Sequence, residues 1–173
     1  VGGMTALYLL QKANLKPGAK VLVYGASGSV GTFAVQLAKQ VFDANVTGVC
    51  STRNLEMVKS LGAEEVIDYT QGDFLHQAQT YDLIFDAVGK LSASGAKTKL
   101  TESGVFLTVR TPTRETLENL SLLKELFDAG KLKPVIDRMF SLAAVADAHR
   151  YVETGRKRGN VVITVASSES GGR

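Results

Sequence analysis

A short apolar segment leads directly into three spaced glycines and then into an amphipathic helix, within residues 21–39. Gly25 suits the tight turn after a strand, Gly28 leaves the backbone open to a phosphate, and Gly31 allows a helix to pack closely on a sheet. The helix N-terminus favours an anion, because its N–H groups are free and its dipole is positive there. The pattern predicts a dinucleotide site; a glycine turn that only joins strand and helix is the alternative. The other loop residues of this predicted site are Ala26, Ser27, Ser29 and Val30.

Strand and helix patterns alternate along most of the chain. Such alternation predicts an α/β fold of the Rossmann type, a doubly wound parallel sheet in a three-layer αβα arrangement with a C-terminal helix-strand tail. Apolar segments predict strands at residues 20–24, 45–50, 65–69, 82–87, 104–109 and 160–165. Helical spacing predicts helices at residues 2–12, 32–41, 54–61, 73–79, 113–129 and 142–153.

The chain of 173 residues, 45% of them hydrophobic, is long enough for one α/β domain with a sizeable core. We expect residues 1–132 to form the nucleotide-binding domain with its N-terminal linking helix, and residues 133–166 to form a separate C-terminal segment. Small polar residues at 167–173 predict a disordered tail. The start at Val1, inside a helical pattern, indicates a fragment or processed product of a longer protein.

The composition excludes several classes of partner. A net charge of +3 is too small to indicate a nucleic acid, and the basic run at 156–158 suits either a solvated helix end or a phosphate contact. The single cysteine, Cys50, excludes an internal disulfide and a site of several cysteines. No apolar run approaches the roughly 20 residues that cross a membrane. Together with the lack of a leader pattern, the single cysteine favours a cytoplasmic protein.

The end of the second predicted strand lacks the acidic residue that a site for NAD usually carries. The chain offers two hydroxyls and a guanidinium there, from Ser51, Thr52 and Arg53, which suit a 2′-phosphate. We therefore expect NADP(H) as the cofactor. The alternative is that Arg53 is solvated and Ser51 caps a helix. Tyr69 could pack on the adenine, donate to the phosphate, or be an ordinary aromatic at a sheet edge.

The fourth and fifth predicted strands end at the same edge of the sheet, where ligands of this fold bind. Small residues there leave room for the nicotinamide ribose, while Asp86 could instead cap the next segment. Thr108, at the end of the fifth strand, is a candidate contact to the nicotinamide. We assign no catalytic residue and no metal, because one cysteine and two isolated histidines do not provide the ligand spacing of a catalytic zinc. The small residues at this edge are Ala87, Val88 and Gly89.

The glycine loop stands in a longer series of motifs, among them Leu-Gly-Ala-Glu-Glu-Val-Ile-Asp-Tyr at 61–69 and Tyr-Asp-Leu-Ile-Phe-Asp-Ala-Val-Gly at 81–89. In this order the chain resembles the cofactor-binding half of the medium-chain dehydrogenase/reductase superfamily, most closely its quinone oxidoreductase-like, zinc-independent branch. The resemblance implies a parent enzyme that transfers hydride from NADPH to a quinone, an activated alkene or a related carbonyl substrate. It places the cofactor across residues 26–30, with Ser51, Thr52, Arg53 and Tyr69 around the 2′-phosphate and residues 87–89 near a ribose.

The chain also departs from this family. The family's N-terminal domain is missing, so we expect the chain alone to lack catalytic activity. The resemblance implies that residues 133–166 are the segment that completes the catalytic domain in this family. Between Val109 and Thr116 the family usually has several dozen more residues, including a sixth strand that commonly mediates dimerisation. We expect residues 161–165 either to lie loose on the surface or to replace that strand, and an exposed apolar strand would permit homo-oligomers. The alternatives are a noncatalytic module that senses NADPH or binds a partner, and a truncated chain that binds nothing.

Overall fold

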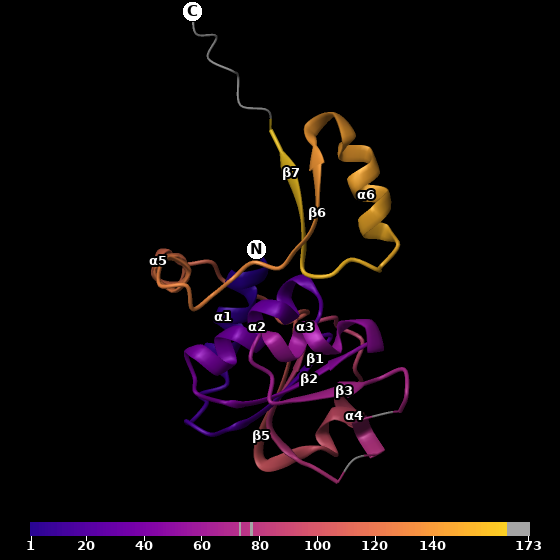
Figure 1. Ribbon diagram of the computed structural model, residues 1–173. Helices are drawn as coiled ribbons and strands as arrows, with labels where there is room; N and C mark the ends of the chain where they lie inside the picture. Colours follow the sequence, from indigo (N-terminus) through magenta and orange to yellow (C-terminus); the bar gives the residue numbers. More distant parts are fainter. Residues whose placement is uncertain (73, 77, 166–173) are drawn as a thin grey trace, which may run out of the picture.

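The computed structural model describes residues 1–72, 74–76 and 78–165. Five parallel strands form its main sheet in the order β3-β2-β1-β4-β5 (Figure 1), which confirms the predicted sheet. Strands β2 and β3 are thus added on one side of β1, and the chain then crosses back to add β4 and β5 on the other side. The strands are β1 (Lys20–Tyr24), β2 (Asn45–Cys50), β3 (Glu65–Asp68), β4 (Tyr81–Asp86) and β5 (Leu100–Thr108).

Helices cover both faces of this sheet, because successive side chains of a strand point to opposite faces and both sets here are apolar. In β1, Val21 and Val23 pack into one core cluster and Leu22 into the other, and all three are fully buried. The first cluster includes α1 (Gly2–Lys12), α2 (Ser29–Gln40), α3 (Leu55–Ser60) and α5 (Leu117–Asp128). The second cluster includes the short η2 (Phe74–His76) and α4 (Ala93–Lys97). The predicted three-layer fold is therefore confirmed.

Helix ends follow local chemistry. Helix α5 begins after Thr116, whose hydroxyl oxygen accepts a hydrogen bond from the Asn119 N–H at 3.2 Å, so this helix is shorter than the predicted 113–129. Gly62 and Gly130 follow α3 and α5 with φ of +111° and +68°, a conformation that glycine adopts without strain. Helix α2 begins at Ser29, three residues earlier than predicted, directly after the glycine loop.

The C-terminal segment differs most from the prediction. Strand β7 (Asn160–Thr164) pairs in parallel with β6 (Ile136–Ser141) in a separate two-stranded sheet, covered by α6 (Val145–Glu153) after the one-turn η3 (Leu142–Ala144). The prediction that the last strand replaces a sixth strand of the main sheet is wrong, and the strand is not loose either. Figure 1 shows β6, β7 and α6 projecting from the main body. Sequence patterns missed β6 because charged residues interrupt its apolar ones.

Smaller differences concern short or irregular elements. The helix predicted at 73–79 is only the turn η2, and residues 73 and 77 lie outside the described residues. Helix α4 was not predicted, since its five residues are too few to show a helical period. The predicted tail at 167–173 also lies outside the described residues. Among the helices that the structure describes, none is long and apolar enough to span a bilayer.

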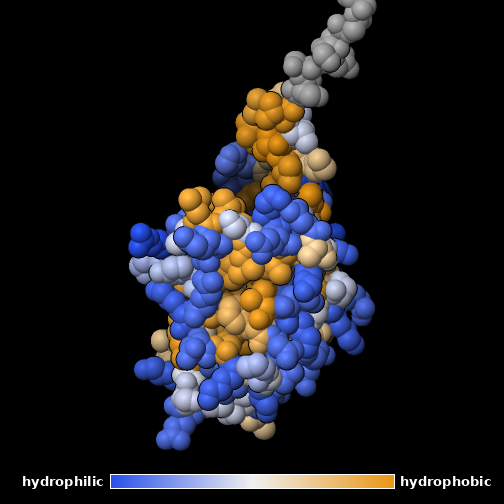
Figure 2. Space-filling view, turned by 90° about the vertical axis from the view of Figure 1, so that its left-hand side faces the viewer, coloured by the Kyte–Doolittle hydropathy of each residue, from blue (hydrophilic) through white to orange (hydrophobic). Residues whose placement is uncertain are grey.

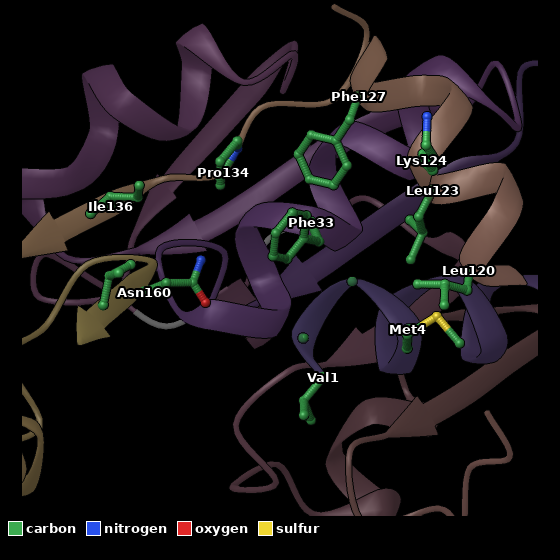
Figure 3. A pocket seen from close by; sticks show the side chains of 13 residues that line it. Val1, Met4, Phe33, Leu120, Leu123, Lys124, Phe127, Pro134, Ile136 and Asn160 are labelled. Atoms are coloured by element: carbon green, nitrogen blue, oxygen red, sulfur yellow. The ribbon is translucent and has the colours of Figure 1, made fainter. Parts of the chain in front are cut away.

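An apolar hollow of about 620 Å³ lies where the two-stranded sheet meets α1 and α5. Figure 3 shows Phe33, Leu123 and Phe127 along its wall, and the two rings pack edge to face with centroids 6.3 Å apart. On the same side of the molecule, Figure 2 shows apolar side chains on both the projecting sheet and the main body. Leu120, which lines the hollow, is 55% exposed, and Met139 of β6 is 62% exposed. This hollow is separate from the glycine loop.

Candidate dinucleotide site

Two of the three motif glycines are required by the backbone of the loop. Gly25 has φ of +78°, and a Cβ added there would overlap the Val88 side chain. A Cβ on Gly31 would overlap the carbonyl oxygen of Gly25 and lie 2.8 Å from the Ala26 Cα. Gly28 has φ of −82°, and a Cβ there would meet only the Gly25 oxygen, at 3.4 Å. The packing of the protein itself therefore does not require a glycine at this position. The role of Gly28 in leaving space for a phosphate stays a prediction.

A cavity of about 510 Å³ lies at the N-terminus of α2. The first N–H groups of a helix have no partner within the helix, so this end offers donors to an anion. The residues of this cavity that the sequence analysis assigned to the site are Gly25, Ser27, Gly28, Ser29, Val30, Tyr69, Ala87 and Val88. Those it did not assign are Tyr24, Cys50, Lys90, Val152, Gly155 and Lys157.

A second cavity, of about 450 Å³, holds the residues predicted to surround a 2′-phosphate. It shares Tyr69 and Gly155 with the first cavity, so the two adjoin. Tyr69 follows β3 and is 53% exposed between them, where a planar ligand could contact its ring. The residues lining the second cavity are Ser51, Thr52, Arg53, Tyr69, Gly155 and Arg156.

Four predicted site residues line neither cavity: Ala26, Gly31, Gly89 and Thr108. Ala26 and Gly31 are buried. The Thr108 hydroxyl accepts a weak hydrogen bond from the Arg110 N–H at 3.4 Å. Asp86 is fully buried and accepts from three backbone N–H groups, those of Val88, Gly89 and Leu91, at 2.8 to 3.0 Å. The interpretation of Asp86 as a cap of the following segment is therefore confirmed.

The polar side chains that follow β2 differ in the hydrogen bonds that they already make within the protein. The Thr52 hydroxyl donates to the Asp68 carboxylate at 2.5 Å, and this bond, with others from Thr70, holds the pKa of Asp68 below its ordinary value. Ser51 precedes the short helix η1 (Thr52–Asn54), but its hydroxyl makes no capping hydrogen bond. The capping alternative for Ser51 is therefore wrong. Arg53 is exposed and donates to the main-chain oxygen of Arg156 at 2.7 Å.

The loop at residues 154–159, between α6 and β7, returns to the glycine loop. The Gly159 N–H donates to the Ser27 carbonyl at 2.8 Å. The Ser29 hydroxyl donates to the side-chain oxygen of Asn160, the residue after Gly159, at 2.6 Å. Lys157 donates to the Gly159 carbonyl at 2.8 Å, and burial lowers the pKa of this lysine. The C-terminal loop thus forms one wall of both cavities.

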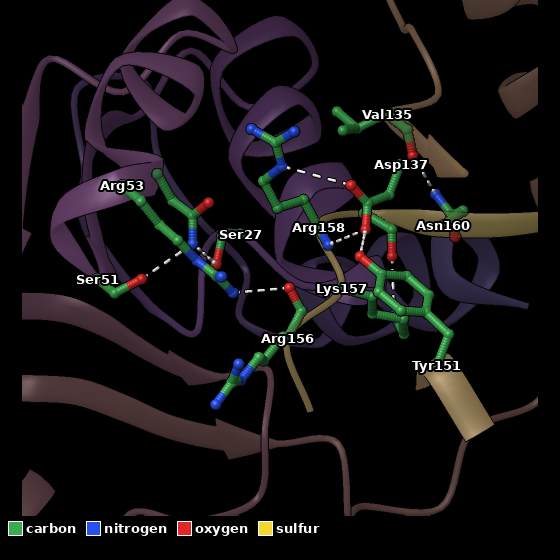
Figure 4. A network of polar contacts seen from close by, with 12 residues as sticks. Ser27, Ser51, Arg53, Val135, Asp137, Tyr151, Arg156, Lys157, Arg158 and Asn160 are labelled. Carbon is green, nitrogen blue, oxygen red and sulfur yellow. Dashed lines mark hydrogen bonds and ion pairs between the residues drawn. The ribbon is translucent and has the colours of Figure 1, made fainter. Parts of the chain in front are cut away.

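Asp137 of β6 holds this loop in place (Figure 4). Its carboxylate accepts from the Tyr151 hydroxyl at 2.5 Å and from the Arg158 N–H at 3.1 Å. Burial by itself would raise the pKa of Asp137, but these hydrogen bonds and the Arg158 charge outweigh burial and lower it. The sequence carries one signal for this loop, the basic run at 156–158, and that run did not predict a place in the site.

No three His, Cys, Asp or Glu side chains gather as metal ligands within the described ranges of the chain. Within this part of the chain, the residues present therefore do not suit a zinc site.

Comparison with known proteins shows which family the chain resembles. Two family models match the chain, both described as zinc-binding dehydrogenase, over residues 29–129 and 96–163. The chain is 40% identical over 169 residues to the 2-methylene-furan-3-one reductase of Solanum lycopersicum, a match that covers 92% of the chain and 44% of that protein. It is 35% identical over 167 residues to the NADPH-dependent alkenal/one oxidoreductase, chloroplastic, of Arabidopsis thaliana, covering 89% and 42%.

Among solved structures, the chain is similar to the quinone oxidoreductase from Coxiella burnetii, with a TM-score of 0.82 and 31% identity. That match covers 96% of the chain and 59% of the other protein. The chain spans less than half the length of the two enone and alkenal reductases that it matches. The family model over residues 29–129 covers more than half of the chain, and the Coxiella burnetii protein shares its fold. The chain therefore belongs to the medium-chain dehydrogenase/reductase superfamily, in its quinone oxidoreductase-like branch.

Proposed function

We propose that this chain is the NADP(H)-binding domain of an oxidoreductase that transfers hydride from NADPH to a quinone, an activated alkene or a related carbonyl substrate. The observation that carries the proposal is the pair of adjoining cavities over the glycine loop, at the carboxyl ends of β1, β2 and β4. Ligands of doubly wound sheets bind at this edge, next to the point where the strand order reverses.

The residues present suit the phosphates of a dinucleotide. The free N–H groups of α2 and the ammonium group of Lys157 would bind the pyrophosphate, and the absence of a side chain at Gly28 leaves the backbone accessible. Ala87 and Val88 would lie against the nicotinamide ribose in the same cavity. NADPH, when bound, supplies the hydride, while the protein binds and orients it.

A preference for NADPH over NADH is supported by the second cavity. Arg53 and Arg156 give it two guanidinium groups, and Ser51 gives it a hydroxyl. The Asp68 carboxylate opposes this preference. It accepts a hydrogen bond from the Thr52 hydroxyl, so that hydroxyl already has an acceptor within the protein. We assign the 2′-phosphate to Ser51, Arg53 and Arg156, and we give Thr52 a smaller part than the sequence suggested.

The proposed substrate class is supported by the names of the relatives, which are a 2-methylene-furan-3-one reductase, an alkenal/one oxidoreductase and a quinone oxidoreductase. A cytoplasmic location remains a prediction, since the Arabidopsis relative is named as chloroplastic. Self-association also remains a prediction. The outer edge of β5 is unpaired within the described residues, and apolar side chains of β6 are exposed, so size-exclusion chromatography with light scattering is the direct test.

The test is a titration of the purified chain with NADPH and, separately, NADH, followed by calorimetry. We expect tighter binding of NADPH, and we expect Arg53→Ala to weaken NADPH binding about tenfold with little effect on NADH. Arg150→Ala is the matched control, because Arg150 is exposed on α6 and pairs with Asp147. Binding of neither nucleotide would overturn the proposal. Because we expect the chain alone to lack activity, binding without hydride transfer fits both this proposal and a sensing module. Hydride transfer to a quinone or an enone after a catalytic domain is supplied separates the two.

A further inference from the structure

A single buried amide connects the two cavities. Asn54, the last residue of η1, is 3% exposed, and its Nδ2 donates to the hydroxyl oxygens of Ser27 at 3.2 Å and Ser51 at 3.0 Å. Ser27 lines the larger cavity and Ser51 the smaller one. Both hydrogen bonds appear in Figure 4 as dashed lines that start at the labelled serines. Asn54 therefore fixes one hydroxyl in each cavity.

The direction of these hydrogen bonds decides what the serines can do. A hydroxyl has one hydrogen to donate and two lone pairs that accept. Because the Asn54 amide already donates to each oxygen, neither serine can direct its own hydrogen at that nitrogen. Each hydroxyl hydrogen is thus left to donate to another group, such as a phosphate oxygen in the adjoining cavity.

The other end of the amide makes no such contact. Asn54 Oδ1 is buried and has no hydrogen-bond partner among the described residues. A buried acceptor without a partner lowers stability. Among the described residues, the Asn54 side chain therefore makes its hydrogen bonds through the NH₂ group alone, and these bonds end on two residues that the proposed site uses.

We propose that Asn54 is a positioning residue for NADP(H): it holds the Ser51 hydroxyl as a donor to the 2′-phosphate and the Ser27 hydroxyl as a donor to the pyrophosphate. This inference rests on the proposed function. Removing the amide frees both hydroxyls to rotate, so NADPH loses two oriented donors and NADH loses one.

The experiment compares binding of NADPH and NADH to the unchanged chain and to Asn54→Ala, with calorimetry as the readout. We expect Asn54→Ala to weaken NADPH binding about tenfold and NADH binding about threefold. Asn45→Ala is the matched control, because Asn45 is an exposed asparagine at the start of β2, whose amide also donates one hydrogen bond, to the Gly18 carbonyl. Asn54→Leu removes the amide without leaving a cavity, because leucine is larger than asparagine, and thermal unfolding without nucleotide shows whether each variant folds.

A double-mutant cycle separates positioning from a general structural effect. If Asn54 acts through Ser51, Ser51→Ala weakens NADPH binding in the unchanged chain but adds at most about twofold in the Asn54→Ala background. A merely structural role predicts that the two losses multiply and that NADPH and NADH are affected equally, and either result would overturn the inference. Failure of the unchanged chain to bind NADPH overturns the proposed function and this inference with it. Unchanged NADPH binding by folded Asn54→Ala and Asn54→Leu overturns this inference alone.

Discussion

The guanidinium of Arg53 donates a hydrogen bond to the main-chain oxygen of Arg156 at 2.7 Å, joining residues 103 positions apart. Arg53 belongs to the turn after β2, and Arg156 to the loop between α6 and β7. Both residues line the same cavity. The C-terminal segment is thus attached to the main domain at the site where we place the 2′-phosphate, and it contributes two cationic residues to the candidate site, Arg156 and Lys157.

Lys157 and Arg156 should have different effects on the two nucleotides. Lys157 lines the cavity assigned to the pyrophosphate, which NADPH and NADH share, so Lys157→Ala is expected to weaken both about tenfold. Arg156→Ala is expected to weaken NADPH several-fold, by about the value of one exposed charge contact, and to leave NADH unchanged. The hydrogen bond from Arg53 survives this change, since it ends on a main-chain oxygen. Titration calorimetry measures all four affinities, with Lys131→Ala as the surface control; equal losses for Arg156→Ala would contradict the assignment.

Asp68→Asn should improve NADPH binding. Because hydrogen bonds from Thr52 and Thr70 keep the pKa of Asp68 below its ordinary value, this carboxylate is charged at neutral pH beside the proposed 2′-phosphate. The substitution removes that charge and the strongest acceptor of the Thr52 hydroxyl. We expect NADPH to bind about threefold more tightly, with NADH unchanged. Asp128→Asn, on the exposed face of α5, is the control; weaker NADPH binding by Asp68→Asn would show that Asp68 supports the site.

Gly31→Ala should lower the stability of the chain even without a bound nucleotide. The added Cβ would overlap the Gly25 carbonyl oxygen, and this backbone cannot move without disturbing the turn after β1. We expect the free energy of unfolding to fall by about 1–3 kcal/mol, as for other overpacked sites. Gly72→Ala is the control, since its added Cβ would have no atom within 4 Å among the described residues beyond its chain neighbours, and its effect should stay within about 0.5 kcal/mol. Urea unfolding of the three proteins gives both values, and equal stabilities would refute the packing argument.

Cys50 should be unreactive in the folded chain. Burial, with a smaller contribution from the Asp68 charge, raises the pKa of its thiol to about 11, and its side chain is 1% exposed. The folded state therefore favours the protonated thiol, and this contribution to stability is lost as the pH rises from about 8.5, the ordinary thiol value, toward 11. At pH 8 we expect iodoacetamide to label the folded chain at least about tenfold more slowly than the unfolded chain. Mass spectrometry of labelling with and without urea measures the ratio, and equal rates would contradict the assigned burial.

Several parts of the fold and the site were predictable from residues close together in the chain. Apolar segments of strand length, glycines at helix ends and the spacing of Gly25, Gly28 and Gly31 are local signals that act within a few residues. They predicted the parallel sheet, most of its helices and the loop under the larger cavity. Helix α4 and strand β6 were missed, because one is too short for a period and the other mixes charged with apolar residues.

The sequence by itself determined the Rossmann-type fold and the family, and it predicted that a dinucleotide binds at the glycine loop and the nearby strand ends. Steric rules and hydrophobic periodicity act between neighbouring residues, so they can be read from the sequence. Only the tertiary structure decided that the loop with Arg156 and Lys157 lines the two cavities, that Asp68 accepts a hydrogen bond from the Thr52 hydroxyl, and that β7 pairs with β6 outside the main sheet. The physical reason is distance along the chain. These contacts depend on how separate elements pack against each other, and no local pattern specifies that packing.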